Sequence, residues 1–367
     1  MKIVFKILVF VTFIVTPISV YSAQNPSYSM MWWFPNSEFA TLTPSKELLW
    51  HVGNSNPDTW LIEKLNPTTG IFNTVSILKG CWKYAYAPQF DLTNMLMLAT
   101  EKYSPTIDVI SLTTGKVAGT FTVDVSPGTD MDVFQPNLAV SPDGSRIVIC
   151  WEDGEDYDNV CEIFNGNTFK SIIKITGIGD QWNNQSISFS RDSKFIYAAS
   201  GLTVDTIDPS TGNIIKSVLP NVINKPGSIF LFHSHAIYSL KDNVAYVYNI
   251  RTGGLSPSIP TNTYYGNFNL SPDNDYLTVD GQSFTNGTFV SLGQVNVYNT
   301  TTGNKVAGLT ITQNTGKGAI VSWPDDHTFI YNTTQQLIYF DIKQNKIIKQ
   351  IPIIRPWEQK GWMPEVK

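Results

Sequence analysis

The sequence predicts an all-β protein, a seven-bladed β-propeller made of four-stranded antiparallel blades. Two turn motifs recur along the chain, each in about seven copies spaced by roughly 40 to 52 residues, a period typical of propellers. The runs between them are short and alternate apolar with polar residues, as in 106–110, which favours strands with a face to bury. We find no amphipathic helix of useful length. Two sandwiches side by side are the alternative, but they would not produce one period through the whole chain.

The chain begins with a segment typical of a secretory signal peptide. Lysines precede a short apolar run over 7–20, and the small residues Ser22 and Ala23 follow it. We therefore expect a signal peptide over 1–22 and a secreted, periplasmic or cell-surface protein. An uncleaved anchor helix is the alternative, but roughly 14 apolar residues fall short of the about 20 that span a bilayer. We expect no membrane span after cleavage.

The expected propeller spans 38–354, and it lies between an N-terminal segment, 23–37, and a C-terminal tail, 355–367. Both flanking segments are rich in aromatic residues, at 28–34 and at 357–362. We expect these aromatic ends to lie near the seam between the first and last blades and to help close the ring. Closure by exchange of a terminal strand is the alternative.

The two turn motifs place the strands within each blade. The first resembles Ser-Pro-Asp-Gly and follows an apolar run, as in 141–144, and the second resembles Asp-Pro-x-Thr-Gly and follows an alternating strand, as in 208–212. Pro, Asp, Asn and Gly supply the backbone dihedral angles of tight turns. With the strands of a blade named a to d from the central axis outward, the first motif joins a to b and the second joins c to d. Both motifs therefore lie on one rim of the ring.

The d–a and b–c connections lie on the other rim, and their lengths vary. Extra residues fall in b–c connections at 53–59, 152–159 and 281–294, and several d–a connections are long and aromatic. Variable connections on a rigid scaffold favour this rim as the working surface.

We identify candidate ligand-binding residues in the d–a connections as aromatic side chains with three polar partners. They are Trp82, Tyr84, Tyr86, Asp130, Asp132, Gln135, Trp182, Tyr264 and Tyr265. Aromatic faces with a few convergent polar groups suit a small molecule, a sugar or a peptide. Packing between blades is the alternative role for these aromatic residues.

Two segments, 141–148 and 204–213, together resemble the exported propellers of the YVTN repeat group, which is similar in fold to WD40 repeats. The resemblance covers nearly all of the chain after the leader, and it implies a fold rather than an activity. The group includes binding proteins, cell-surface proteins and relatives with lactonase activity. The lactonase relatives tend to carry a Pro-His-Ala segment before an inner strand, and this sequence has no such segment.

Three cysteines are an awkward number for an oxidising compartment. Cys150 and Cys161 fall on consecutive predicted strands of one hairpin, where a cross-strand disulfide is geometrically feasible. Two free buried thiols are the alternative. Cys81 is expected to be unpaired.

The strongest cluster of charge is the acidic b–c connection at 152–159. Asp153, Glu155, Asp156 and Asp158 place several carboxylates on one short loop, and such oxygen ligands suit Ca²⁺. Their spacing does not match the twelve-residue EF-hand loop, and a solvated hairpin tip is the alternative. We expect no other cofactor.

Composition and motifs reduce the number of functions that the sequence supports. The net charge is −5 and no basic block is present, so nucleic acid is a poor partner. His233 and His235 alternate on one strand, but no third metal ligand is near them in the sequence, and no Gly-x-Ser-x-Gly nucleophile motif is present. Our first hypothesis is therefore a non-catalytic, exported scaffold that binds a protein, peptide or glycan partner through the d–a and b–c rim. A lactonase-like hydrolase is the alternative, and a structural surface-layer component is a third hypothesis.

Overall fold

The computed structural model describes the backbone of residues 18–20, 29–31, 37–42, 49–56, 59–66, 68–79, 89–91, 93–101, 104–126, 136–153, 158–176, 187–200, 203–218, 226–240, 243–261, 265–285, 288–311, 319–333 and 336–353, with side chains described from Ile62 onward apart from several strand ends and hairpin tips. Every regular element in these ranges is a strand. In the same ranges, no helix is long and apolar enough to cross a membrane.

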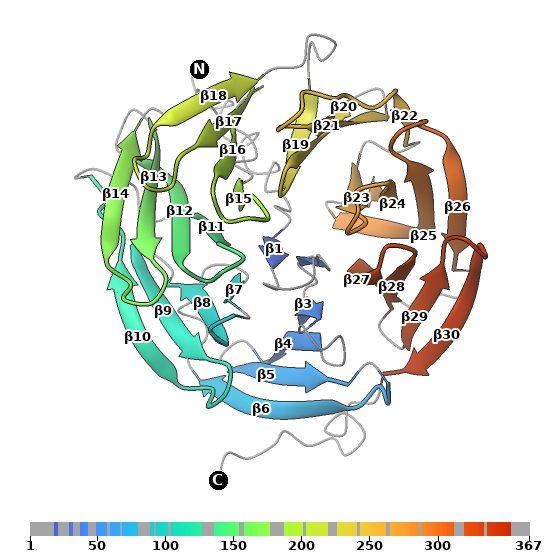
Figure 1. The fold of residues 1–367 in the computed structure, drawn as a ribbon. Coiled ribbons are helices and arrows are strands. Elements are labelled where there is room, and N and C mark those ends of the chain that lie inside the picture. The colour runs from blue at the N-terminus through green and yellow to red at the C-terminus, as the bar shows by residue number, and fades with distance from the viewer. Residues whose placement is uncertain are drawn as a thin grey trace, which may run out of the picture.

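Seven four-stranded antiparallel sheets form a ring, as predicted (Figure 1). The first strand of each sheet lies toward the centre of the ring and the last lies at the periphery. The blades, in chain order, are β3 (Ser37–Leu42), β4 (Leu49–Asn56), β5 (Thr59–Leu65) and β6 (Phe72–Lys79); β7 (Gln89–Asp91), β8 (Leu96–Thr100), β9 (Thr106–Ser111) and β10 (Val117–Thr122); β11 (Asn137–Val140), β12 (Arg146–Asp153), β13 (Asp158–Asn165) and β14 (Ser171–Thr176); β15 (Ile187–Phe189), β16 (Ile196–Ser200), β17 (Thr203–Ile207) and β18 (Ile214–Val218); β19 (Pro226–Phe232), β20 (His235–Leu240), β21 (Val244–Asn249) and β22 (Ile259–Pro260); β23 (Tyr265–Leu270), β24 (Tyr276–Thr285), β25 (Thr288–Asn299) and β26 (Lys305–Thr310); and β27 (Ala319–Asp325), β28 (Thr328–Asn332), β29 (Gln336–Asp341) and β30 (Lys346–Pro352).

The Ser-Pro-Asp-Gly motif forms the a–b turn through its own side chains. In the third blade, the Ser141 hydroxyl donates to Asp143 Oδ1 at 2.7 Å and accepts from the Arg146 backbone N–H at 2.8 Å. Asp143 Oδ1 also accepts from the Ser145 backbone N–H at 3.0 Å. The same arrangement recurs at Ser190 in the fourth blade and at Ser271 in the sixth. The motif therefore folds locally, because serine and aspartate satisfy the backbone donors that the turn leaves open.

The Thr-Gly motif forms the c–d turn in a similar way. At its first position, the Asn299 side chain accepts from the backbone N–H groups of Thr301 at 3.1 Å and Thr302 at 2.8 Å. Asn66, Asn165 and Asn249 make the corresponding pair of bonds in other blades. Because these bonds close within a few residues, the sequence predicts both turns without knowledge of the packing.

The ring closes without strand exchange. Each sheet, including the first and the last, takes its four strands from one contiguous segment. At the closing seam, the c–d turn of the first blade meets the outer strand of the last: an ideal Cβ added at Gly70 would lie 2.0 Å from the Pro352 carbonyl oxygen. The same position also approaches the preceding blade at Gly115, 1.7 Å from Ser76 Cβ, and at Gly303, 2.9 Å from the Ser258 carbonyl oxygen. Closure therefore repeats the contact that joins the other blades.

A short N-terminal hairpin, β1 (Ile18–Val20) with β2 (Ser29–Met31), lies inside the ring (Figure 1). β1 contacts the inner strands β7 and β11, and β2 contacts the inner strands β3 and β27 of the first and last blades. β2 thus lies at the seam where we expect the N-terminal aromatic stretch. β1 falls within residues 1–22, where the sequence predicts a signal peptide. The C-terminal aromatic stretch, 357–362, and the expected tail lie outside the described residues.

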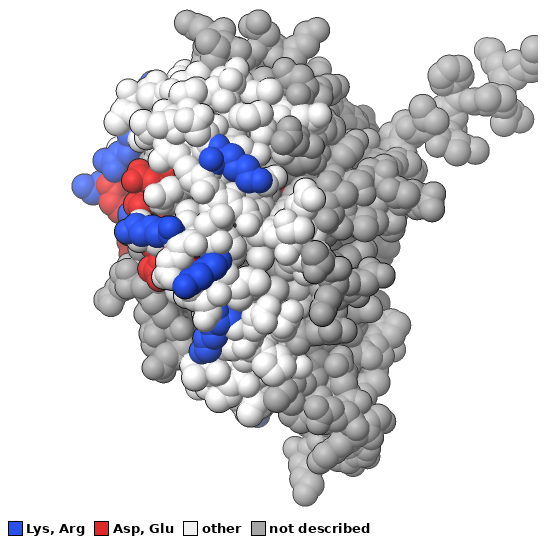
Figure 2. Space-filling model, turned by 90° about the vertical axis from the view of Figure 1, so that its right-hand side faces the viewer, with Lys and Arg blue, Asp and Glu red and all other residues white. Residues whose placement is uncertain are grey.

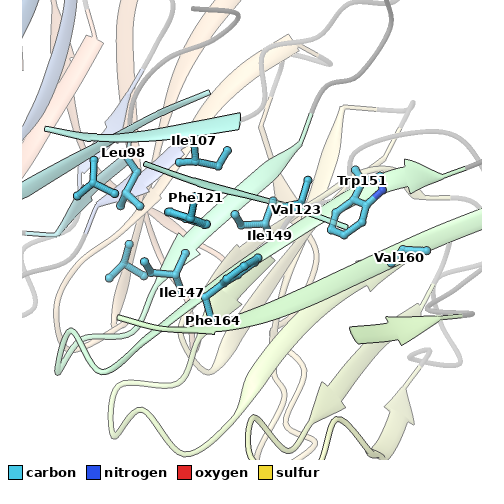
Figure 3. Packing of buried hydrophobic residues seen from close by; sticks show 11 residues of the cluster. Leu98, Ile107, Phe121, Val123, Ile147, Ile149, Trp151, Val160 and Phe164 are labelled. Atoms are coloured by element: carbon cyan, nitrogen blue, oxygen red, sulfur yellow. The ribbon is translucent and has the colours of Figure 1, made fainter. Parts of the chain in front are cut away.

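The core consists of layers between neighbouring blades, because alternate side chains of each strand face opposite neighbours. Between the second and third blades, Leu98 and Phe121 meet Ile149, Trp151 and Phe164 (Figure 3). The rings of Phe121 and Phe164 lie 4.8 Å apart. This layer gives each blade two buried faces, which a single four-stranded sheet could not obtain alone.

Candidate functional site

The rim that carries the d–a and b–c connections is the candidate functional site. Of the ligand-binding residues that the sequence predicts, Tyr265 is the first residue of β23, opposite Gln282 of β24. The other eight lie outside the described residues: Trp82, Tyr84, Tyr86, Asp130, Asp132, Gln135, Trp182 and Tyr264.

Of the extra b–c residues that the sequence shows, those that the structure describes are mainly strand. The b and c strands of the first, third and sixth blades are lengthened, and the longest pair is β24 with β25, of 10 and 12 residues. Their pairing continues to Thr285 opposite Thr288. The predicted variable segments therefore extend three hairpins toward this rim on a hydrogen-bonded framework.

The acidic hairpin tip of the third blade lies on the same rim. Asp153 ends β12 and Asp158 begins β13, and the two residues are directly opposed in the register. Glu155 and Asp156 lie outside the described residues. Among the residues that are described, no group of three or more His, Cys, Asp or Glu side chains is placed to hold a metal ion.

Cys150 and Cys161 are directly opposed on β12 and β13 of this hairpin, and their sulfurs form a disulfide. Their Cα atoms lie 4.0 Å apart. Both side chains are buried and face the fourth blade, against Phe189 and Ile196 among others. The bond thus lies inside the layer and braces the hairpin that carries the acidic tip. Cys81 lies outside the described residues.

Removal of this disulfide is expected to lower the free energy of unfolding by about 2–3 kcal/mol, because it closes a short loop in the unfolded chain. The variant is Cys150→Ala with Cys161→Ala, measured by urea denaturation against the oxidised wild type. A reducing agent should lower the stability of the wild type and leave the double variant unchanged. An equal response of the two proteins to the reductant would contradict this assignment.

Three histidines lie on the opposite rim, at or beside a–b turns. His233 occupies the turn between β19 and β20, His235 begins β20, and His327 lies in the turn between β27 and β28. His233 is buried, its backbone N–H donates to Ser188 Oγ at 3.2 Å, and its Nδ1 lies 3.1 Å from the Phe189 carbonyl oxygen. These contacts give His233 a structural role in the seam between the fourth and fifth blades.

Stability is expected to fall as the pH drops below about 6.5. Burial lowers the pKa of His233 from 6.5 to about 3, and that of His235 to about 4. Because each folded-state pKa lies below its unfolded value, the unfolded chain binds protons first, and stability is lost from pH 6.5 toward these lower values. At pH 4.5 the loss from His233 is on the order of 2–3 kcal/mol, at 1.36 kcal/mol per pKa unit.

His233→Asn tests this pH dependence. Asn tolerates the positive φ of 46° that His233 adopts, and it does not titrate. Urea denaturation at pH 6.5, 5.5 and 4.5 should show a shallower loss of stability in the variant than in the wild type. Parallel curves for the two proteins would contradict the assignment.

A polar pair between the c and d strands recurs in the blades, and the sequence analysis did not detect it. A hydroxyl on the d strand donates to a buried carboxylate directly opposite on the c strand. The pairs are Thr74 with Glu63 at 3.1 Å, Thr120 with Asp108 at 2.8 Å, and Ser217 with Asp205 at 2.5 Å. Burial raises the pKa of Asp205, and the hydroxyl bond opposes that rise. The regular spacing of 11 or 12 residues within each pair is the sequence signal that would have found it.

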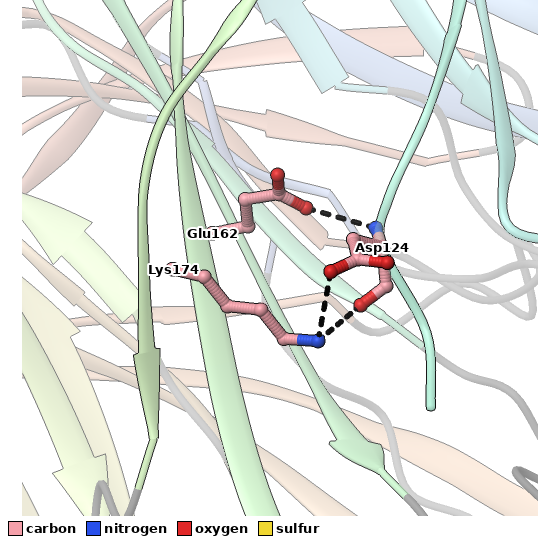
Figure 4. Close-up of polar contacts among 3 residues, drawn as sticks. All are labelled: Asp124, Glu162 and Lys174. Carbon is pink, nitrogen blue, oxygen red and sulfur yellow. Dashed lines mark hydrogen bonds and ion pairs between the residues drawn. The ribbon is translucent and has the colours of Figure 1, made fainter. Parts of the chain in front are cut away.

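The third blade replaces this pair with a contact across a seam (Figure 4). Glu162 lies opposite Lys174, and a Glu162 carboxylate oxygen accepts from the Asp124 backbone N–H of the second blade at 3.0 Å. Lys174 donates to the Asp124 carbonyl oxygen and lies 3.4 Å from its carboxylate. The Asp124 side chain is 80% exposed, so the ion pair itself adds little stability. The Glu162 carboxylate thus joins the second and third blades through its bond to the Asp124 backbone N–H.

Comparison with known proteins supports the architecture. No protein-family model matches the chain, and no curated protein matches its sequence. Among solved structures, Hsv2 of Kluyveromyces lactis has a TM-score of 0.56 at 11% identity, over 86% of this chain and 98% of that chain. The chain has a β-propeller fold. Hsv2 of Kluyveromyces marxianus has a TM-score of 0.55 at 13% identity, over 90% of this chain and all of that chain. Hydrazine synthase of Kuenenia stuttgartiensis has a TM-score of 0.50 at 16% identity, over 71% of this chain and 84% of that chain. At these identities the likeness concerns the fold alone.

Proposed function

We propose that this protein is an exported, non-catalytic propeller of the YVTN type that binds a protein, peptide or glycan partner through the rim with the d–a and b–c connections. The observation that carries the proposal is the difference between the two rims. The a–b and c–d turns are short, internally hydrogen-bonded and packed against neighbouring blades. The opposite rim carries the three lengthened hairpins and the aromatic d–a connections.

The positions of the histidines favour binding over hydrolysis. A lactonase-like site on the candidate rim needs an ionisable base there. Of the four histidines, His233, His235 and His327 lie on the opposite rim, and the side chain of His51 lies outside the described residues. Burial also keeps His233 and His235 neutral at physiological pH. A binding surface built from aromatic side chains needs no such group.

A melting scan of the leaderless protein against Ca²⁺, oligosaccharides, small lactones and peptides tests the proposal. A ligand at 100 times its dissociation constant adds about 2.7 kcal/mol to stability, so one sugar or peptide class should raise the melting temperature by several degrees. Trp82→Ala with Trp182→Ala should abolish the shift. Thr113→Ala with Thr301→Ala, on the exposed turns of the other rim, should leave it unchanged.

Two results would redirect the proposal. Turnover of a lactone, lost in the tryptophan variant, would replace binding by hydrolysis. A sugar or peptide shift that survives in the tryptophan variant would place the site elsewhere. A shift with Ca²⁺ that disappears in Asp153→Asn with Asp158→Asn would add an ion at the acidic hairpin tip.

A further inference from the structure

The c and d strands of the sixth blade lack the hydroxyl–carboxylate pair that the first, second and fourth blades carry at the corresponding positions. Asn296 of β25 lies directly opposite Gly308 of β26. In the first, second and fourth blades, these two positions hold a carboxylate and a hydroxyl. Glycine contributes no side chain here, and the end of the Lys305 side chain lies over Gly308 instead.

A pocket of about 450 Å³ occupies this place. Its lining includes Gln294, Asn296, Lys305, Gly308, Thr310 and Asn345. Asn345 comes from the c–d turn of the seventh blade, and its Oδ1 accepts from the Gly308 backbone N–H at 3.0 Å. The pocket thus lies at the seam of two blades, as an open depression in the surface rather than an enclosed cavity.

The lining residues suit a ligand that carries several hydroxyl groups and one negative charge. Asn296 and Gln294 each offer a donor and an acceptor, as sugar hydroxyls require. No carboxylate is among the lining residues. The Lys305 side chain folds over Gly308: its Nζ lies 3.2 Å from an ideal Cβ at that position. Lys305 therefore brings a positive charge to the floor of the pocket.

Basic side chains also lie on the surface around the pocket. Lys and Arg side chains spread over the side of the ring where β26 and β30 lie, and acidic side chains gather toward one edge of it (Figure 2). Lys346 and Lys349 lie on β30, and neither β26 nor β30 contains an acidic residue. Asp341 of β29 lies directly opposite Lys346. Exposed Val306 and Ile347 add apolar surface beside these charges. A net charge of −5 for the whole chain makes this face distinct.

We propose that the pocket at Gly308 binds a sugar that carries a carboxylate, such as a uronic acid unit of an acidic glycan. The hydroxyl groups bind the amide side chains of Asn296 and Gln294, and the carboxylate binds the Lys305 ammonium group. The neighbouring lysines of β30 attract the rest of an anionic chain. This site is separate from the aromatic rim, so it does not depend on the partner proposed there.

Titration calorimetry with tetragalacturonate tests the site, with a neutral galactose tetramer and acetate as comparison ligands. We expect binding of tetragalacturonate, at least roughly tenfold weaker binding of the neutral tetramer, and no measurable binding of acetate. Gly308→Thr places a threonine in the pocket, as at the corresponding position of the second blade. Within 3.4 Å, the added Cβ meets only the end of the flexible Lys305 side chain. This variant should lose roughly tenfold or more in affinity, and so should Lys305→Gln.

Lys216→Gln, an exposed lysine on the outer strand β18 of the fourth blade, is the matched control and should keep the wild-type affinity. The double variant at Trp82 and Trp182 should also keep it, which separates this site from the aromatic rim. The proposal is overturned if the wild type does not bind tetragalacturonate at 10 mM, or if Gly308→Thr and Lys305→Gln both bind as the wild type does. Equal affinity for the neutral tetramer or for acetate overturns it as well.

Discussion

Trp151→Ala is expected to lower the free energy of unfolding by about 3–5 kcal/mol, the range for large aromatic side chains removed from a core. Trp151 is fully buried on β12, in the layer between the second and third blades (Figure 3). The Lys174 ammonium group lies 5.7 Å from the centre of its ring. The substitution removes apolar surface and leaves a cavity between two sheets, and the backbone bonds of both sheets resist its collapse.

Urea denaturation of the oxidised protein measures this loss. Trp151→Phe keeps an aromatic ring in the layer, so it should cost less than half as much as Trp151→Ala. Val117→Ala, at a position 49% exposed on the outer strand β10, should change stability by less than about 0.5 kcal/mol. If Trp151→Ala cost no more than Val117→Ala, the layer between these blades would not be the source of stability.

Gly70→Ala is expected to lower stability by about 3 kcal/mol or more, because it opens the seam between the first and last blades. Gly70 has a φ of 72°, and an added Cβ would lie 2.0 Å from the Pro352 carbonyl oxygen and 2.7 Å from Ile351 Cγ2. The backbone oxygen cannot move without displacing β30. The substitution therefore adds a steric clash to the cost of a positive φ for alanine, which by itself is about 1 kcal/mol.

The matched control for the seam is Gly253→Ala. Gly253 occupies the same position in the c–d turn of the fifth blade with a φ of 80°, but the nearest atom to an added Cβ is Tyr248 Oη at 3.8 Å. This control thus carries the backbone strain without the clash. We expect Gly70→Ala to cost at least about 2 kcal/mol more by urea denaturation, and to speed proteolysis of the native ring. Equal losses in the two variants would mean that this contact does not hold the ring closed.

The sequence predicted the features of this protein whose interactions close within a few residues. Ser141 and Asp143 form their turn by bonding to each other and to neighbouring backbone groups, so the motif carries its own geometry. Asn299 does the same for a c–d turn. Seven repeats of these two turns determine the blade count and the strand order.

The features that depend on contact between distant segments came from the tertiary structure. Ring closure without strand exchange depends on the contact between Gly70 and Pro352, which are far apart in the chain. The extra residues of β24 and β25 are strand because each strand satisfies the backbone groups of the other, and the sequence alone does not reveal this pairing. The pocket at Gly308 depends on the register that sets this glycine opposite Asn296 and on Asn345 of the next blade. The physical reason is one of range: turn residues bond to their neighbours in the chain, whereas seams and pockets are made by residues that only the closed ring brings together.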